Sequence, residues 1–343
     1  MKAPPFDAIY SRENLALAWH KVSLGKTKTT AVIDFYRNLD ANLASIARDL
    51  RSGAYQPGPY KQFLIKDPKE RIISAASIRD RVVQHAIMNC YDPVFDRYQL
   101  FDSYACRRNK GTQKAVLRAF HFAKSSPYFL KMDVRHYFNS IDHAVLKGFL
   151  RRLIKVPLVE RLLGTIIDAS VEREEKGVPI GNLTSQYFAN HYLAVFDHYL
   201  KERHGVKKYL RYMDDMLVFT DDKAALKTLY TVAESFNQDT LRLTLKPSMS
   251  GSTDDDGAPF LGFLIKRHGI YLQRKSKRRY IARLAEIEHH RLHGLFSEVE
   301  VGKRIESVTA HLLLARSRDF RNTVLHGRFI GLEPCVARRE LEP

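Results

Sequence analysis

The chain has 343 residues, 45% of them hydrophobic, which is enough for two or three packed units with a sizeable core. Its formal net charge is +18, because Lys and Arg outnumber Asp and Glu by 56 to 38, and such an excess indicates a polyanionic partner, either nucleic acid or an acidic membrane surface. No run of about 18 apolar residues is present and the N-terminus lacks the apolar stretch of a signal peptide, so neither a spanning helix nor a secreted protein is expected.

The three cysteines, Cys90, Cys106 and Cys335, lie far apart and form no Cys-x-x-Cys pair. They suit a reducing cytoplasm and no structural zinc. The basic segments also lack a clear amphipathic anchor, so nucleic acid is a better candidate partner than a membrane. We therefore expect a cytoplasmic, nucleic-acid-binding protein.

The first part of the chain predicts helix and then a hairpin. Apolar residues recur at helical spacing over 14–52, with a possible break at Gly25, and Pro57-Gly58-Pro59 closes the segment. Two apolar runs, 63–65 and 71–73, then flank a basic turn and predict a β-hairpin.

The rest of the chain mixes strands and helices without a βαβ rhythm and without Gly-x-Gly-x-x-Gly, so a dinucleotide-binding fold is not expected. A basic and mostly helical tail ends the chain. The pattern predicts an α+β core. The expected elements are helices over 78–90, 142–154 (with Asp142 as N-cap), 184–199 and 222–238, a buried strand over 128–134, two strands within 208–220 joined at Asp214-Asp215, and a short strand over 260–265.

Asp214 and Asp215 stand between two apolar or aromatic strands. A solvated surface turn is the simplest interpretation, but Asp-Asp is a poor hairpin turn, and adjacent like charges repel unless a cation neutralises them. Asp133 ends another strand; a lone aspartate there is usually a turn or cap residue, but it could share metal ions with Asp214 if the strands are neighbours. Phosphoryl transfer uses two divalent ions about 4 Å apart, and ligation by oxygen alone suits Mg²⁺.

Tyr212-Met213-Asp214-Asp215 resembles the palm motif of reverse transcriptases, and residues 133–138 (Asp-Val-Arg-His-Tyr-Phe) resemble the upstream motif of the same palm. The resemblance implies a catalytic site in which Asp133, Asp214 and Asp215, with Val134, hold two Mg²⁺ ions. It further implies that Phe138 is the steric gate that excludes a 2′-hydroxyl; packing in the core is the alternative role for this ring.

Further blocks resemble the family in the same order, at residues 68–71, 80–86, 103–107 and 260–263. The resemblance implies a right-hand polymerase, with an antiparallel palm sheet packed on helices. Its parts would be an N-terminal helical extension (1–59), fingers and palm (60–265) and a helical thumb with a tail (266–343). Lys69, Arg71 and Lys246 would bind the incoming dNTP, since Arg and Lys grip phosphate.

Residues 177–186 depart from most reverse transcriptases, with Ile180 in place of Gln and Gln186 in place of Pro. The resemblance implies that Ile180 and Gln186, like Phe138, contact the incoming nucleotide. This block resembles diversity-generating retroelement reverse transcriptases. The resemblance implies a structured template RNA, a small basic accessory protein, and errors at template adenines that diversify a target gene. Because Ile offers only contact area where Gln forms polar pairs, we expect Ile180 and Arg71 to loosen base selection. The alternatives are an antiphage-defence reverse transcriptase and a non-catalytic, maturase-like RNA-binding protein.

A basic run opens the tail, and a solvated helix face is its simplest interpretation. In a polymerase it would contact phosphates of the RNA/cDNA duplex, which position the duplex but carry no sequence information. His289, His290 and His293 are closely spaced, and we expect a polar face rather than a metal site. The proposed duplex-binding residues are Arg274, Lys275, Lys277, Arg278 and Arg279.

Overall fold

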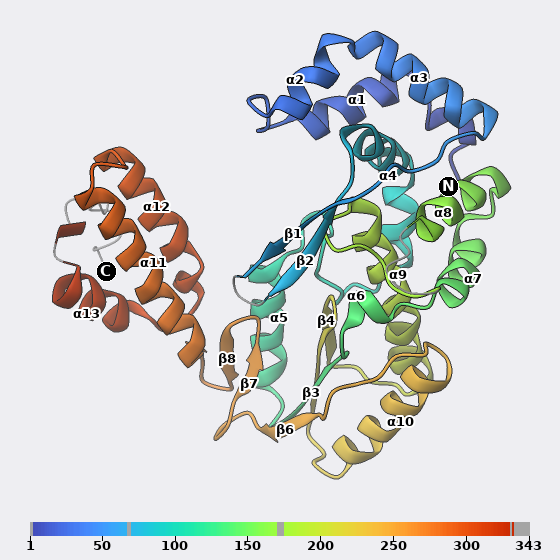
Figure 1. Cartoon of the computed structure of the whole chain (residues 1–343). Helices are drawn as coiled ribbons and strands as arrows, with labels where there is room; N and C mark the ends of the chain where they lie inside the picture. The colour runs from blue at the N-terminus through green and yellow to red at the C-terminus, as the bar shows by residue number, and fades with distance from the viewer. Residues whose placement is uncertain (1–2, 67–69, 170–174, 330, 333–343) are drawn as a thin grey trace. The chain divides into compact units, whose positions relative to one another are not determined.

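The computed structural model, drawn in Figure 1, describes residues 3–66, 70–169, 175–329 and 331–332. Its contacts divide the chain into two units that interleave along the sequence. Unit 1 comprises Met1–Asn109, Asp133–Lys207 and Thr231–Lys246, and unit 2 comprises Lys110–Met132, Lys208–Tyr230 and Pro247–Pro343. The three continuous domains expected from the sequence stay a prediction, because the contact units follow different boundaries.

Unit 1 is built around a long central helix. Its elements are α1 (Arg12–Ser23), α2 (Thr30–Arg37), α3 (Leu39–Ser52), β1 (Lys61–Ile65), β2 (Arg71–Ala75), α4 (Ile78–Tyr98), α6 (Tyr137–Ser140), α7 (His143–Ile154), α8 (Pro157–Asp168) and α9 (Leu183–His198). Helix α4 contacts α1, α3, α7 and α9, and Val82, Val83 and Ile87 on it are fully buried. Apolar burial along α4 therefore supplies the core of this unit.

Local signals explain most boundaries in unit 1. The predicted break in the first helical segment is confirmed, because Gly25 takes a left-handed backbone (φ 70°) between α1 and α2. Asp142 is confirmed as the N-cap of α7, where its side chain accepts a hydrogen bond from the Val145 amide. The predicted end of the helix at residue 90 is wrong. Helix α4 continues through Pro93 to Tyr98 because Phe95 packs against the rings of Tyr187 and His191.

Unit 2 holds two small sheets and a helical end. Its elements are α5 (Thr112–Lys124), β3 (Tyr128–Asp133, whose last residue belongs to unit 1), β4 (Tyr209–Tyr212), β5 (Asp215–Thr220), the first part of α10 (Ala225–Asp239), β6 (Met249–Ser252), β7 (Ala258–Phe260), β8 (Phe263–Lys266), β9 (Gly269–Leu272), α11 (Arg274–Leu292), α12 (Glu298–Ala310) and α13 (Arg318–Arg328). The sheets run β4-β5-β3-β6 and β7-β8-β9, and α5 contacts β4, β5 and β8.

Two expectations for unit 2 need correction. Residues 260–265 do not form one strand, because Leu261 (φ 49°) and Gly262 (φ 92°) take left-handed backbones and turn the chain into the antiparallel β7–β8 hairpin. The tail also contains strand β9 before its helices begin. The expected α+β class is confirmed, and the pairs β1–β2, β3–β6, β4–β5, β7–β8 and β8–β9 are all antiparallel.

Candidate functional site

The β4–β5 hairpin of unit 2 carries two of the candidate carboxylates. The predicted pair of strands is confirmed, but the junction lies one residue earlier than Asp214-Asp215: Tyr212 pairs with Asp215, so Met213 and Asp214 form the two-residue turn and Asp215 begins β5. Met213 has φ 55°, a left-handed conformation that costs a non-glycine residue about 1–2 kcal/mol. Arg211 lies fully buried beneath the turn and donates a hydrogen bond of 3.1 Å to the Met213 carbonyl. The turn is therefore strained, and a buried cation fastens it to the strands.

A lysine on strand β3 holds the second of these carboxylates. The Nζ atom of Lys131 lies 2.9 Å from Oδ1 of Asp215 and donates to the Pro259 carbonyl at 2.9 Å. Both side chains of the ion pair are only about one-fifth exposed, at 22% for Lys131 and 20% for Asp215. Lys131 thus supplies the cation that adjacent aspartates need. Lys131 was not among the site residues predicted from the sequence. The available signal was a lysine inside an otherwise apolar strand.

Asp133 begins a segment of unit 1 and is paired in a similar way. The Nζ atom of Lys246 lies 2.5 Å from Oδ1 of Asp133, and the Lys246 amide donates to the Asp133 carbonyl at 2.8 Å. Val134, which is buried, forms a β-bridge with Leu245. Backbone pairing therefore places Lys246 beside Asp133. The expected role of Lys246 at a triphosphate stays a prediction.

Phe138 and Ile180 lie on neighbouring segments of unit 1. The Val178 amide donates to the Phe138 carbonyl at 2.9 Å, and the Ser74 amide donates to the Ile180 carbonyl at 2.9 Å. The segment 177–180 therefore connects α6 to strand β2, and both Phe138 and Ile180 are half-buried. Gly181 (φ 113°) follows, and a side chain there would meet Ile73 at 2.7 Å.

The other predicted nucleotide-binding residues are less closely grouped. Arg71 is exposed at the start of β2, opposite Ile65, and lies three residues from the Ser74 contact. Gln186 is half-buried in the second turn of α9. Lys69 lies outside the described residues. The structure thus links Phe138, Ile180 and strand β2 through the backbone, whereas Gln186 belongs to a separate element, helix α9.

Asp80 belongs to a motif that resembles the family, yet its contacts are structural. Its buried carboxylate accepts hydrogen bonds from the Tyr55 hydroxyl (2.9 Å), the Gly58 amide (3.0 Å) and the Ser77 hydroxyl (2.6 Å). Burial, reinforced by the Asp80 carboxylate, raises the pKa of Tyr55 above its ordinary value. Asp80 therefore fastens the segment between α3 and β1 to the start of α4.

The basic run opens helix α11, and all five of its candidate cations are exposed. The first turn of this helix contains no acidic residue. Cations at a helix N-terminus meet the positive end of the helix dipole, which is unfavourable unless an anion lies nearby. Farther along, His290 and His293 each contact a backbone carbonyl through Nδ1.

The described residues include no group of three or more His, Cys, Asp or Glu side chains arranged to hold a metal ion. Asp133 belongs to unit 1, whereas Asp214 and Asp215 belong to unit 2. Within the part of the chain that the structure covers, no helix is both long enough and apolar enough to cross a membrane.

Comparison with known proteins identifies relatives of this chain. Residues 65–265, more than half of the chain, match the family described as "Reverse transcriptase (RNA-dependent DNA polymerase)". Protein YkfC of Escherichia coli is 31% identical over 183 residues, which cover 48% of this chain and 48% of that protein. The group II intron-encoded protein LtrA of Lactococcus lactis is 25% identical over 175 residues, or 47% of this chain and 28% of LtrA.

The chain therefore spans less than half the length of these curated relatives. Among solved structures, telomerase from Candida tropicalis is similar, with a TM-score of 0.49 and 13% identity over 89% of this chain and 64% of that one. The family match, rather than this structural likeness, carries the assignment.

Proposed function

The chain belongs to the reverse transcriptase family, and we propose that it copies RNA into DNA by two-metal nucleotidyl transfer. The observation that carries the proposal is the β4–β5 hairpin, which presents Asp214 and Asp215 at a two-residue turn. Strand β5 neighbours β3 in the sheet, and β3 ends at Asp133. Neighbouring strands that end in carboxylates are a natural ligand source for a phosphoryl-transfer site.

The chemistry of these donors fits hard divalent cations. Asp133, Asp214 and Asp215 offer carboxylate oxygens, and Val134 can add only its backbone carbonyl; such oxygen donors suit Mg²⁺. When bound, two such ions supply the positive charge that stabilises the attacking and leaving oxygens of an in-line displacement. The family supports the use of divalent ions in general, and Mg²⁺ is our specific proposal.

Two lysines position the carboxylates. Residues two apart on a strand share a face, so Lys131 and Asp133 project from the same side of β3. Lys131 holds Asp215, and Lys246 holds Asp133. The Lys246 side chain is 40% exposed. We assign it a second task, which is to contact the triphosphate of the incoming dNTP.

The Phe138–Ile180 region of unit 1 would select the nucleotide. Phe138 serves as the gate against a 2′-hydroxyl, and Arg71 and Lys69 contribute phosphate contacts. Ile180 presents an apolar surface where polar discrimination between bases is lost. Gln186 lies six residues further along the chain, in helix α9. This composition supports error-prone copying at template adenines, and hence the diversification of a target gene.

The basic start of α11 would bind the RNA/cDNA duplex. Arg274, Lys275, Lys277, Arg278 and Arg279 are exposed, and a phosphate backbone would offset their unfavourable position at a helix N-terminus. A structured template RNA and a small basic accessory protein complete the proposed assembly.

The test is primer extension on an RNA template with dNTPs and Mg²⁺. We expect full-length DNA from the wild-type chain and from Asp221→Asn, which alters an aspartate that is 72% exposed on the same strand-and-loop segment. Asp214→Asn should yield no extension above background. Equal extension by Asp214→Asn would refute the assignment of the hairpin, and a wild-type chain that binds RNA but never extends a primer would favour the maturase-like alternative.

A further inference from the structure

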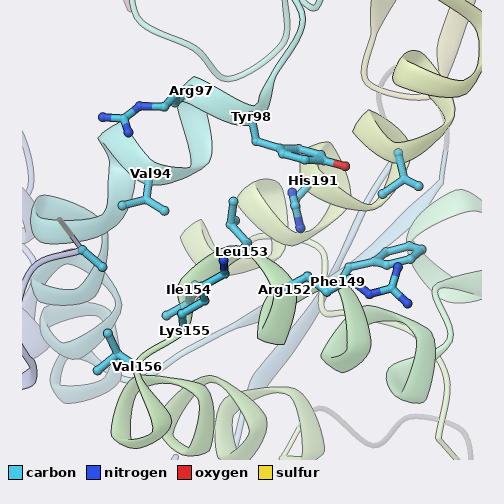
Figure 2. A pocket seen from close by; sticks show the side chains of 12 residues that line it. Val94, Arg97, Tyr98, Phe149, Arg152, Leu153, Ile154, Lys155, Val156 and His191 are labelled. Carbon is cyan, nitrogen blue, oxygen red and sulfur yellow. The ribbon is translucent and has the colours of Figure 1, made fainter. Parts of the chain in front are cut away.

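A cavity of about 700 Å³ lies within unit 1 among helices α4, α7 and α9. Figure 2 shows the rings of Tyr98, His191 and Phe149 toward one side of the view and Val94 and Val156 toward the other. The volume lies within the range of about 300–1,000 Å³ that is usual for small-molecule sites. The lining residues are Ala3, Val94, Arg97, Tyr98, Phe149, Arg152, Leu153, Ile154, Lys155, Val156, His191 and Val195. The wall is thus mainly apolar and aromatic.

His191 is an unusual member of this wall because its polar atoms are not both satisfied. The side chain is 2% exposed, and neither Nδ1 nor Nε2 meets the geometry of a hydrogen bond with the described part of the protein, although the Phe149 backbone lies close enough to the ring to raise its pKa. Burial lowers the pKa of His191 to about 4, so the ring is neutral near pH 7 and carries one donor and one acceptor. The Tyr98 ring packs edge-on at 4.8 Å. Buried polar groups normally have partners, and the Phe149 backbone can serve only one of the two ring nitrogens, so the other points to an absent ligand.

The cations of the cavity are the second observation. Arg97, Arg152 and Lys155 line it and are all exposed, and no ion pair of these three occurs among the described residues. No acidic residue belongs to the lining. The cavity therefore combines an apolar body with a positive rim, which is complementary to an anion that carries an apolar part.

Lys155 also occupies a costly backbone position. It is the C-cap of α7 with φ 53° and ψ 26°, a left-handed conformation that glycine adopts with the least strain. A lysine there sacrifices stability and places an ammonium group at the rim of the cavity. Strain of this kind is a reason to look for a functional role.

We propose that this cavity binds a small organic anion with an aryl or alkyl body. The body fills the space among Val94, Phe149 and Val195, and the acid group meets Arg97, Arg152 and Lys155. The open ring nitrogen of His191 adds one polar contact to the ligand from the wall of the cavity. This site is separate from the carboxylates assigned to polymerisation, and it does not depend on that assignment.

The test uses anilinonaphthalene sulfonate, a fluorescent aryl anion, with the full chain. We expect one saturable site, from which dodecanoate displaces the dye and dodecylammonium does not. Arg152→Ala should weaken binding about tenfold, equivalent to about 1.4 kcal/mol. Arg161→Ala, which removes an equally exposed arginine from the neighbouring helix α8, should leave the affinity unchanged.

Lys155→Gly separates binding from folding. Because glycine relieves the left-handed strain, this variant should melt at the same temperature as the wild type or higher, while its dye affinity falls. Val195→Trp should abolish binding by filling the cavity. Unchanged affinity in both Arg152→Ala and Lys155→Gly would overturn the proposal. Displacement by dodecylammonium as readily as by dodecanoate, or by dATP but not dodecanoate, would overturn the class of ligand.

Discussion

The two units present their candidate carboxylates in similar ways but in different surroundings. In unit 2, Asp215 and Lys131 form a mostly buried pair, and Lys131 is also fixed to the Pro259 carbonyl. In unit 1, Asp133 and Lys246 form a more open pair, with exposed fractions of 30% and 40%. The buried pair is suited to fixing charge in place, whereas the open pair leaves its lysine accessible to a substrate. On the proposed function, Asp215 is therefore the more rigidly held ligand, and unit 1 contributes both Asp133 and the groups that choose the nucleotide.

The largest expected effect concerns selection by unit 1. Phe138→Ala should admit ribonucleotides, because a gate that rejects one hydroxyl by contact is worth about 10- to 200-fold in discrimination. The measurement is the ratio of kcat/KM for dNTP and rNTP on the same RNA template. Phe122→Ala, a ring on α5 of unit 2, is the matched control and should leave the ratio unchanged. If the ratio is unchanged in Phe138→Ala, the Phe138 ring packs in the core and does not act as a gate.

Asp80 provides a carboxylate in unit 1 that should serve stability rather than chemistry. Asp80→Asn removes the charged acceptor of three hydrogen bonds, and bonds to charged groups contribute about 1.5–3 kcal/mol each, with strong non-additivity. We expect the free energy of unfolding to fall by about 2–3 kcal/mol, measured by urea denaturation. The folded fraction should retain primer extension. Loss of extension without loss of stability would contradict this division of roles.

Substitution of Lys131 and of Lys246 tests the difference between the buried and the open ion pair most directly. Lys131→Met leaves a mostly buried carboxylate without its cation, so unfolding free energy should fall by about 1–3 kcal/mol. Lys246→Met should change stability by less than about 1 kcal/mol, because an exposed pair is screened by solvent. It should instead raise KM for the dNTP. If Lys246→Met lowers the unfolding free energy more than Lys131→Met does, the claim that the Lys131–Asp215 pair contributes more to stability is wrong.

The smallest expected effect is on base selection. Ile180→Gln should restore a polar contact and lower errors at template adenines, with little effect on the overall rate. Sequencing of the cDNA measures this change. Leu183→Gln, three residues later at the start of α9, introduces the same amide side chain at a different position. This control should leave the errors at template adenines unchanged. An unchanged spectrum of errors in Ile180→Gln would remove Ile180 from the fidelity mechanism.

Much of this organisation could be predicted from the sequence where the signal is local. The β4–β5 hairpin follows from two apolar strands around two acids, although its turn lies at Met213-Asp214, and the Asp142 cap follows from an aspartate before an amphipathic run. Partners distant in sequence could not be predicted in this way. Lys131 reaches Asp215 across 84 positions, and Lys246 reaches Asp133 across 113. Sheet pairing, rather than local propensity, creates both contacts.

The short elements near residue 260 show a second limit. The apolar run Phe260–Ile265 has the composition of one strand, yet two left-handed residues inside it turn the chain back on itself. Gly262 was the available local signal for a turn, whereas Leu261 is an unfavourable residue for that conformation. Packing of the β7–β8–β9 sheet overrides the local preference.

The most direct test of the central claim is the Mg²⁺ dependence of primer extension in three variants, Asp133→Asn, Asp214→Asn and Asp215→Asn. If carboxylates from both units serve one metal-dependent reaction, wild-type extension requires Mg²⁺ and ceases with a chelator. Each variant then loses more than about 100-fold in kcat/KM, beyond the effect of outer-shell partners of a metal. Extension that persists without divalent ions, or in Asp133→Asn at the wild-type rate, would contradict the account.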